Sequence, residues 1–274
     1  MTSSELGALL RRVDPVAYPE LESYSREEIY GHGDQLSPGG LFLASRMARK
    51  LDLRPGDVVL DVGCGFGASS IFLADRYDVD VVALDIGVPA ATVAERADAK
   101  GYADRIQPLN CDVTKPLPFA NKYFDAICCM TCFHYFGANE GFLAHLLRYL
   151  KPGKRLSVSD TCFNQEVTGS ELPDVYRRVA PGNTFDSWQM ETSKYHSPAW
   201  WRRLFEDSGI VNVVECVGLE DGPAMWEDKL AYDLERANWD DTKIDQLQWK
   251  IDQILYGRDH RPFFTFFLAT LEKL

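Results

Sequence analysis

The sequence predicts an α/β fold: a mostly parallel sheet of seven strands with helices on both faces. Two observations support this prediction. Short apolar runs typical of buried strands alternate with helix-like segments, and the first run leads into a glycine-rich turn. Strands are expected at 58–62, 80–84, 106–110, 124–130, 155–159, 211–217 and 263–271. Helices are expected at 41–51, 67–76, 89–101, 139–149 and 197–209, and the amphipathic segment 5–30 is expected to be helical with a break near its prolines.

The glycine-rich turn lies between the first strand and its helix, in the sequence VVLDVGCGFGASS from Val58 to Ser70. Gly63, Gly65 and Gly67 carry no Cβ, so the backbone here can approach a ligand closely. The helix N-terminus that follows offers unpaired N–H groups. These features together predict a ligand site at this turn.

Two carboxylates follow the next strands. Asp85 ends the second strand, where an acid accepts hydrogen bonds from ribose hydroxyls in nucleotide-binding sheets. Asp112 follows the third strand, where it can accept from an adenine amino group. The sequence therefore predicts that the ligand carries an adenosine.

A dinucleotide-binding dehydrogenase is the main rival to be excluded. Its fingerprint needs a third glycine, but this chain has Ala68 and Ser70 in that region. Asp61 and Asp112 would also repel a pyrophosphate, whereas they suit a cationic sulfonium.

After the glycine-rich turn, Asp85 and Asp112, two further elements follow along the chain: the buried strand ending at Met130 and the turn Leu150-Lys151-Pro152-Gly153. Over roughly residues 35–160 this series of elements resembles the class I S-adenosylmethionine-dependent methyltransferases. The resemblance implies a Rossmann-like fold and S-adenosyl-L-methionine as the cofactor. The expected cofactor-binding residues are Ser37, Asp61, Gly63, Cys64, Gly65, Gly67, Asp85, Ile86, Asp112, Val113, Cys129 and Met130.

A second resemblance concerns the loop 31–40, the helical insertions late in the chain and His134. All three are similar to the phosphobase (phosphoethanolamine-type) N-methyltransferases, in which a His at this position works with a Tyr of the N-terminal loop. Gln35 occupies the position of that Tyr. Met130 occupies the position of the family's Asp four residues before its His, and Thr161 occupies that of an aromatic residue after the fifth-strand Asp. The resemblance therefore implies the architecture and a small-molecule acceptor rather than phosphoethanolamine itself.

Methyl transfer to an amine requires a neutral nitrogen, so a nearby base helps the reaction. His134 is the first catalytic candidate because histidine titrates near neutrality, and His32 and Tyr30 are the alternatives from the loop. Tyr195 and His196 are expected to line the acceptor site, His145 to be structural and His260 to lie in an exposed turn.

Segments outside the alternating core are expected to cover the acceptor. The predicted organisation is an N-terminal helical lid and loop at 1–40 and a methyltransferase domain at 41–274, with helical insertions at about 162–194 and 219–261. The tryptophans of the second insertion, Trp226, Trp239 and Trp249, are expected to pack its helices together.

Composition restricts the partners. The net charge of −12 and the lack of a basic stripe argue against nucleic acid and fit an amine substrate. No apolar run is long enough to span a bilayer, and the N-terminus lacks the layout of a signal peptide. The seven cysteines fit unpaired cytoplasmic thiols, and Cys129 and Cys132 form a CxxC without a second pair at metal-ligand spacing, so no metal is expected.

Several alternatives stay open on the sequence alone. The acceptor atom can be oxygen, sulfur or carbon instead of nitrogen, because lid residues choose it without a readable code. A non-catalytic module that only binds the cofactor is a third hypothesis. The identity of the acceptor, the number of methyl groups transferred and the oligomeric state are not encoded in any motif.

Overall fold

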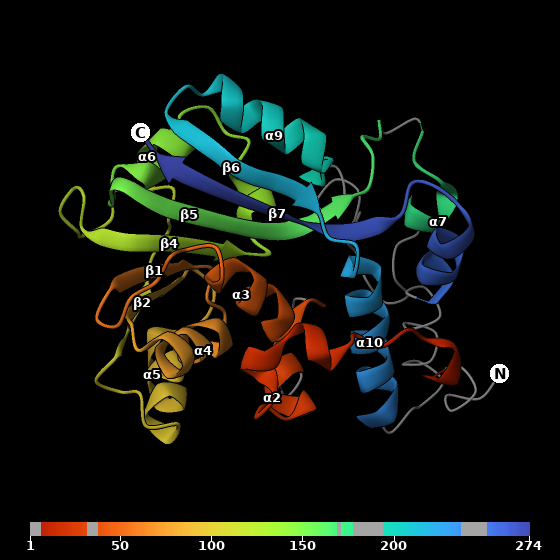
Figure 1. The fold of residues 1–274 in the computed structure, drawn as a ribbon, viewed down its shortest axis with the longest axis horizontal. Helices are drawn as coiled ribbons and strands as arrows, with labels where there is room; N and C mark the ends of the chain where they lie inside the picture. The colour runs from red at the N-terminus through yellow and green to blue at the C-terminus, as the bar shows by residue number, and fades with distance from the viewer. Residues whose placement is uncertain (1–6, 32–37, 169–170, 178–193, 237–250) are drawn as a thin grey trace.

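The computed structural model describes residues 7–31, 38–168, 171–177, 194–236 and 251–274 (Figure 1). These residues form one seven-stranded sheet with the order β3-β2-β1-β4-β5-β7-β6. The strands are β1 (Val58–Val62), β2 (Asp80–Asp85), β3 (Ile106–Asn110), β4 (Phe124–Met130), β5 (Leu150–Phe163), β6 (Val211–Gly218) and β7 (Phe264–Lys273). Strands β1 to β5 pair in parallel, and β7 runs antiparallel between β5 and β6. The predicted fold class is confirmed.

Helices cover both faces of the sheet because residues along the buried strands alternate between two apolar clusters. One face carries α3 (Gly40–Ala48), α4 (Ala68–Tyr77), α5 (Ala90–Ala99) and α10 (Gly222–Arg236). The other carries α6 (Phe142–Leu147) and α9 (Pro198–Asp207). The remaining short helices are α2 (Arg26–Tyr30), α7 (Asp174–Arg177) and the 3-10 turns η1 (Pro15–Ala17), η2 (Pro19–Leu21) and η3 (Phe133–Tyr135), and residues 251–259 are also helical.

The N-terminal segment differs from its prediction. The expected break near the prolines is present, but the helical parts on either side of it are shorter than expected: the described part contains a helical turn at 7–9, the two 3-10 turns and α2. Pro15 and Pro19 each begin a 3-10 turn, since a proline lacks the N–H that a continuous helix would need there. A second difference is β5, which is much longer than the expected 155–159.

The sequence did not decide whether the aromatic β7 strand is an edge or a core strand. In the structure it is an interior strand between β5 and the edge strand β6, and it is buried. Phe266 stacks on Trp226 of α10 with ring centroids 5.6 Å apart, and Phe267 stacks on Trp201 of α9 on the opposite face, also at 5.6 Å. Trp226 therefore packs a helix onto the sheet, as expected, while Trp239 and Trp249 lie outside the described residues.

The carboxyl ends of the parallel strands meet at one edge of the sheet. Val62 lies beside Leu84 in β2 and Cys129 in β4. The antiparallel β7 begins at this same edge, since Cys162 near the end of β5 pairs with Thr265. In sheets of this type, ligands bind beyond this edge.

Charged side chains fasten the N-terminal segment to the body of the protein. Glu20 accepts hydrogen bonds from Ser45 (3.0 Å) and from the Arg49 guanidinium (2.6 Å from Nε), both at or beside α3. Arg26 of α2 binds Asp228 of α10 with 2.5 Å between nitrogen and oxygen. The segment is thus tied to two helices that lie far apart in the sequence (Figure 1). Among the helices of the described ranges, none combines the length and apolarity that a membrane span requires.

The Glu20 contacts predict an acid-sensitive attachment. The Arg49 hydrogen bond lowers the pKa of Glu20 to about 2, from an ordinary value of 4.5. Because the folded-state pKa is depressed, this stabilisation is complete above pH 4.5 and is lost as the pH falls through about 2. Glu20→Gln should remove that part of the acid dependence and raise hydrogen exchange in residues 15–21 at neutral pH.

The measurement is hydrogen exchange followed by mass spectrometry, with thermal melting between pH 2 and 7. Glu22→Gln, an exposed carboxylate two residues along, is the matched control. Equal protection of residues 15–21 in Glu20→Gln and the parent would contradict the prediction.

Candidate active site

The glycine-rich turn is built as a tight loop between β1 and α4. Gly63, Gly65 and Gly67 all have positive φ, at 71°, 54° and 83°, which side chains with a Cβ rarely adopt. The amides of Gly63 and Cys64 donate to Leu84 O at 2.8 and 3.1 Å, so the turn is fixed to the end of β2. The turn is thereby held in place by backbone contacts with the neighbouring strand.

What a side chain would meet differs among these glycines. A Cβ at Gly63 would lie 2.4 Å from Cys132 Sγ, and one at Gly67 would lie 2.8 Å from Val93 Cγ1. A Cβ at Gly65 would meet no protein atom within 4 Å. Gly63 and Gly67 are thus needed for packing within the protein, whereas the space in front of Gly65 is available to a ligand.

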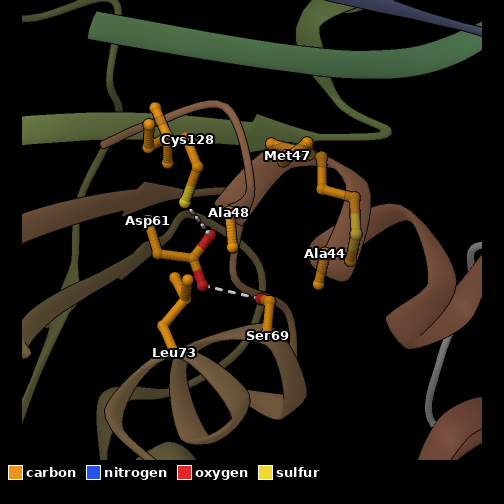
Figure 2. A pocket seen from close by; sticks show the side chains of 9 residues that line it. Ala44, Met47, Ala48, Asp61, Ser69, Leu73 and Cys128 are labelled. Carbon is orange, nitrogen blue, oxygen red and sulfur yellow. Dashed lines mark hydrogen bonds between the residues drawn. The ribbon is translucent and has the colours of Figure 1, made fainter. Parts of the chain in front are cut away.

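Asp61 lies beneath the turn and is fully buried. Its carboxylate accepts hydrogen bonds from Ser69 Oγ (2.6 Å) and Ser70 Oγ (2.7 Å) at the start of α4, and from Cys128 Sγ at 3.5 Å. Figure 2 shows Asp61 between Ser69 and Cys128, beside a narrow pocket that α3 closes with Ala44, Met47 and Ala48. Burial raises the pKa of Asp61. These contacts support its expected role of orienting the turn.

Asp85 at the end of β2 joins two loops. Its Oδ2 accepts from the Gly65 amide at 2.9 Å, and its Oδ1 accepts from the amides of Gly87 (2.7 Å) and Val88 (2.9 Å). A carboxylate oxygen can accept two hydrogen bonds, so Oδ2 retains a lone pair for a ribose hydroxyl. The same residue therefore shapes the glycine-rich turn and faces the predicted ribose position.

Asn110 is a contributor that the sequence analysis missed. Its side-chain amide donates to the carbonyls of Asp85, Ile86 and Val88 at 2.9, 3.2 and 3.1 Å. It thus fixes the loop after β2 from the end of β3. The only signal in the sequence was its place at a strand end, directly before Cys111 and Asp112.

The expected adenine contacts lie on either side of this loop. Ile86 leaves 70% of its surface exposed, an unusual position for a large apolar side chain that no protein group covers. Asp112 Oδ1 accepts from Thr114 N (2.9 Å) and Thr114 Oγ1 (2.7 Å), which lowers the pKa of Asp112, and Oδ2 takes no part in these two bonds. Val113 is buried, and its carbonyl is 3.0 Å from His145 Nε2, so His145 has the expected structural role.

Cys129 and Met130 end β4 beside the turn. Cys129 is fully buried, and burial raises its pKa well above the ordinary thiol value. Its Sγ lies 3.1 Å from Cys132 Sγ, which in turn donates to Val62 O at 3.3 Å. Within the described ranges, no group of three or more metal-ligating side chains comes together.

His134 lies on η3, directly after β4, and is bound to a buried carboxylate. Its backbone N is 2.9 Å from Asp160 Oδ2, and its Nδ1 is 2.9 Å from Asp160 Oδ1. The side chains are 5% and 0% exposed. The sequence analysis noted Asp160 only as the fifth-strand acid, although its place at the carboxyl edge of the sheet was an available signal.

The other catalytic candidates are placed differently. Tyr30 is completely buried, its ring packs against Phe42 and Tyr232, and burial together with the nearby Asp228 carboxylate raises its pKa. These contacts give Tyr30 a packing role. His32 and the cofactor candidate Ser37 lie outside the described residues.

Of the remaining candidates, Tyr195 and His196 are half-buried and His260 is exposed. His196 stacks on Trp200 and lies 2.7 Å from Glu166, and Tyr195 contacts the His134 ring at 5.0 Å. His260 is exposed and stacks on Tyr256, as expected for a turn residue.

The residues present fit S-adenosylmethionine. The open space at Gly65, the free lone pair of Asp85, the uncovered Ile86 and the ionised Asp112 follow one another along the same edge of the sheet. An adenosine needs hydroxyl acceptors, an apolar surface for its base and an amino acceptor, and these residues supply that set.

Comparison with known proteins defines the class. Residues 59–153 match a family model described as a methyltransferase domain. These residues contain the glycine-rich turn, Asp85, Asp112 and β4, so the match falls on the predicted cofactor site within the expected Rossmann-like fold.

The particular relatives are phosphoethanolamine and antibiotic methyltransferases. Phosphoethanolamine N-methyltransferase 1 of Arabidopsis thaliana is 26% identical over 235 residues, which cover 85% of this chain and 44% of that protein. The 27-O-demethylrifamycin SV methyltransferase of Amycolatopsis mediterranei is 27% identical, covering 61% of this chain and 68% of that protein. The chain spans less than half the length of the plant relatives. The resemblance that the sequence indicated is confirmed.

Among solved structures, phosphoethanolamine N-methyltransferase 2 of Haemonchus contortus in complex with S-adenosyl-L-methionine is similar, with a TM-score of 0.66. It is 17% identical, and the alignment covers 95% of this chain and 58% of that one. At this identity the match establishes a shared fold.

The open space at Gly65 leads to a prediction. Gly65→Ala should weaken S-adenosylmethionine binding by on the order of tenfold or more, which corresponds to ~1.4 kcal/mol, because the new methyl group occupies space that only a ligand would fill. Isothermal titration calorimetry measures the change.

Gly56→Ala is the matched control, since Gly56 also has positive φ (82°) with no atom within 4 Å of a Cβ, but lies in the exposed turn before β1. Both variants should lose a similar stability, about 1–2 kcal/mol, from the left-handed backbone. Equal cofactor affinity in the two variants would show that Gly65 does not face the cofactor.

Proposed function

We propose that this protein transfers a methyl group from S-adenosylmethionine to a small-molecule amine. The observation that carries the proposal is the arrangement of Gly65, Asp85 and Asp112 inside the matched methyltransferase domain. Asp85 accepts from the Gly65 amide through its carboxylate, and its carbonyl accepts from the amide of Cys111, the residue directly before Asp112. The names of the plant relatives support nitrogen as the acceptor atom. The acidic composition and a buried histidine beside the site also favour an amine.

The proposed roles follow the geometry of the site. The turn at Gly63, Cys64, Gly65 and Gly67 presents its backbone to the methionine part of the cofactor, and Asp61 holds that turn from below. Asp85 binds the ribose, Ile86 flanks the adenine, and Asp112 accepts from the adenine amino group, with the Val113 N–H nearby. Cys129 and Met130 lie beside the sulfonium, and Ser37 is proposed to contact the carboxylate.

The bound cofactor supplies an activated methyl group, so the protein mainly positions the reactants and excludes water. The N-terminal segment and α10 are proposed to cover the acceptor, consistent with the ion pair between Arg26 and Asp228 that joins them. His134 is proposed as the base near the acceptor, and His32 is the alternative. Tyr30, the other candidate from the loop, is not proposed, because its ring is buried against Phe42 and Tyr232.

Two further assignments belong to the proposal. The protein is proposed to act in the cytoplasm, since free thiols such as Cys128, Cys129 and Cys162 fit a reducing compartment. No nucleic-acid partner is proposed for a chain with a net charge of −12.

Methylation of oxygen is the second candidate, because the rifamycin relative is named as an enzyme for an O-demethylated substrate. The test is a radiolabelled methyl-transfer screen of the purified protein over small amines, including phosphoethanolamine and sarcosine, together with phenols, alcohols, thiols and carboxylates. Label on an amine supports the main proposal, and label only on a hydroxyl compound supports the second. Cofactor binding without transfer to any class would favour a binding module.

The Asp85 contacts predict a strong loss of cofactor affinity on truncation. Asp85→Ala removes the ribose acceptor and also the tether of the Gly65 amide, so the Kd for S-adenosylhomocysteine should rise by roughly tenfold to a hundredfold. Asp57→Ala is the control, because Asp57 caps a turn at the opposite end of β1, where it accepts from Arg54 N at 3.0 Å. Unchanged affinity in Asp85→Ala would remove the ribose assignment.

A further inference from the structure

We propose that Asp160 is a positioning residue that fixes the tautomer of His134, so that Nε2 presents a lone pair to the methyl acceptor and takes its proton. This inference rests on the proposed function and extends it, because neither the sequence motifs nor the relatives assign a role to Asp160. The argument depends on three observations: how the carboxylate is bound, what Nε2 contacts, and which charged groups surround the pair.

The Asp160 carboxylate is a complete acceptor site. It is fully buried, and it receives the amides of His134 (2.9 Å) and Thr161 (2.7 Å) as well as the His134 ring nitrogen Nδ1 (2.9 Å). An ionised carboxylate can only accept hydrogen bonds, so Nδ1 must carry the proton. In a neutral imidazole the proton on Nδ1 leaves Nε2 as the acceptor.

The two hydrogen bonds to His134 also fix its orientation. One oxygen binds the backbone N–H of the residue and the other binds its ring, so main chain and side chain are held by one rigid group. Since β5 places Asp160 opposite Phe267 in the centre of the sheet, the carboxylate itself cannot move far. The direction of Nε2 is therefore set by the sheet rather than by a loop.

The Nε2 atom is buried, and it has no hydrogen-bond partner within the part of the chain that the structure describes. A buried polar atom without a partner is unfavourable, so in a native structure it calls for an explanation such as a bound ligand or a catalytic role. The chain carries His134 close to the cofactor turn: η3 follows β4 directly, and Cys132, two residues before His134, contacts Val62 O at the end of β1. A bound amine would supply the missing donor.

Among the residues that the structure describes, few charged groups lie near the ring and compete with Asp160. Tyr135 packs on the ring at 3.9 Å, and Tyr195 contacts it at 5.0 Å. Lys194 places its ammonium 5.1 Å from the centre of the Tyr135 ring. Near the carboxylate, Cys129 and Cys162 are buried thiols with raised pKa values, so they are neutral at physiological pH. Asp160 is thus the charged group in direct contact with His134.

The proton and electron balance of the step is simple. The acceptor ammonium gives one proton to His134 Nε2, which leaves a lone pair on nitrogen and a positive imidazolium beside Asp160. The nitrogen then forms a bond to the methyl carbon while the carbon–sulfur bond breaks, and that electron pair stays on sulfur. His134 returns its proton to water after the product leaves, so no further reactant is needed.

Asp160→Asn tests this arrangement. The amide group can place its NH₂ against Nδ1, which moves the ring proton to Nε2 and removes the acceptor, while the shape of the side chain is kept. With the amine that the parent protein methylates fastest in the screen, kcat should fall on the order of 100-fold. The Kd for S-adenosylhomocysteine should stay within about threefold of the parent value. The acidic limb of the pH profile of kcat/KM should shift to lower pH or disappear.

Asp125→Asn is the matched control. Asp125 is also a buried carboxylate of the sheet, but it lies at the opposite end of β4, where it accepts from Val58 N at 3.2 Å and from Lys151 at 2.7 Å. Its replacement can lower stability but should leave the pH profile unchanged. A parent-like kcat and pH profile in Asp160→Asn would overturn the proposal, and so would the same profile change in both variants.

A second measurement keeps the proposal falsifiable if Asp160→Asn does not fold or the screen finds no acceptor. The ¹⁵N chemical shifts of the His134 ring in the parent protein report the tautomer directly, and they require no methyl acceptor. A proton on Nδ1 supports the inference even where the amine assignment fails. A proton on Nε2 at neutral pH would overturn it even where amines are methylated.

Discussion

The parallel pairing of β1 with β2 and β4 is the constraint on which the site depends. It brings Val62, Leu84 and Cys129 side by side, so the loops that follow all begin at the same edge. The amides of Gly63 and Cys64 continue this pairing by donating to Leu84 O. The glycine-rich turn is therefore an extension of the sheet. Its position relative to Asp85 is set by backbone geometry, and the cofactor contacts follow from that geometry.

The fold was predictable to the extent that its signals were local. The apolar runs located the strands, the strand-to-helix turn at Gly67 marked the start of α4, and Ser197 and Pro198 marked α9, whose N-cap hydrogen bond to Trp200 N is present. The predictions were wrong where tertiary packing decided the outcome. Residues 5–30 have an amphipathic pattern, but in the described residues 7–30 the prolines and the contacts with α3 and α10 limit helix to a turn at 7–9 and the short α2.

Only the part of the site that follows the first two strands was predictable from the sequence. Asp61, Asp85 and the glycines follow strands in a recognisable order, and the structure brings them together. Asn110 and Asp160 could not be assigned, because each acts through a residue distant in sequence: Asn110 through the loop after β2, and Asp160 through His134, 26 residues away. Such pairs are created by strand order, and no spacing along the chain encodes them.

The interior position of β7 has a consequence for how the chain is made. Strand β6 ends at Gly218, but the strand that separates it from β5 begins only at Phe264. During synthesis, the long apolar flank of β5 thus leaves the ribosome well before its antiparallel neighbour exists. Unpaired edges of this kind recruit other nascent chains. The last strand thus closes the sheet, and a chaperone that shields β5 in the meantime would protect the yield of folded protein.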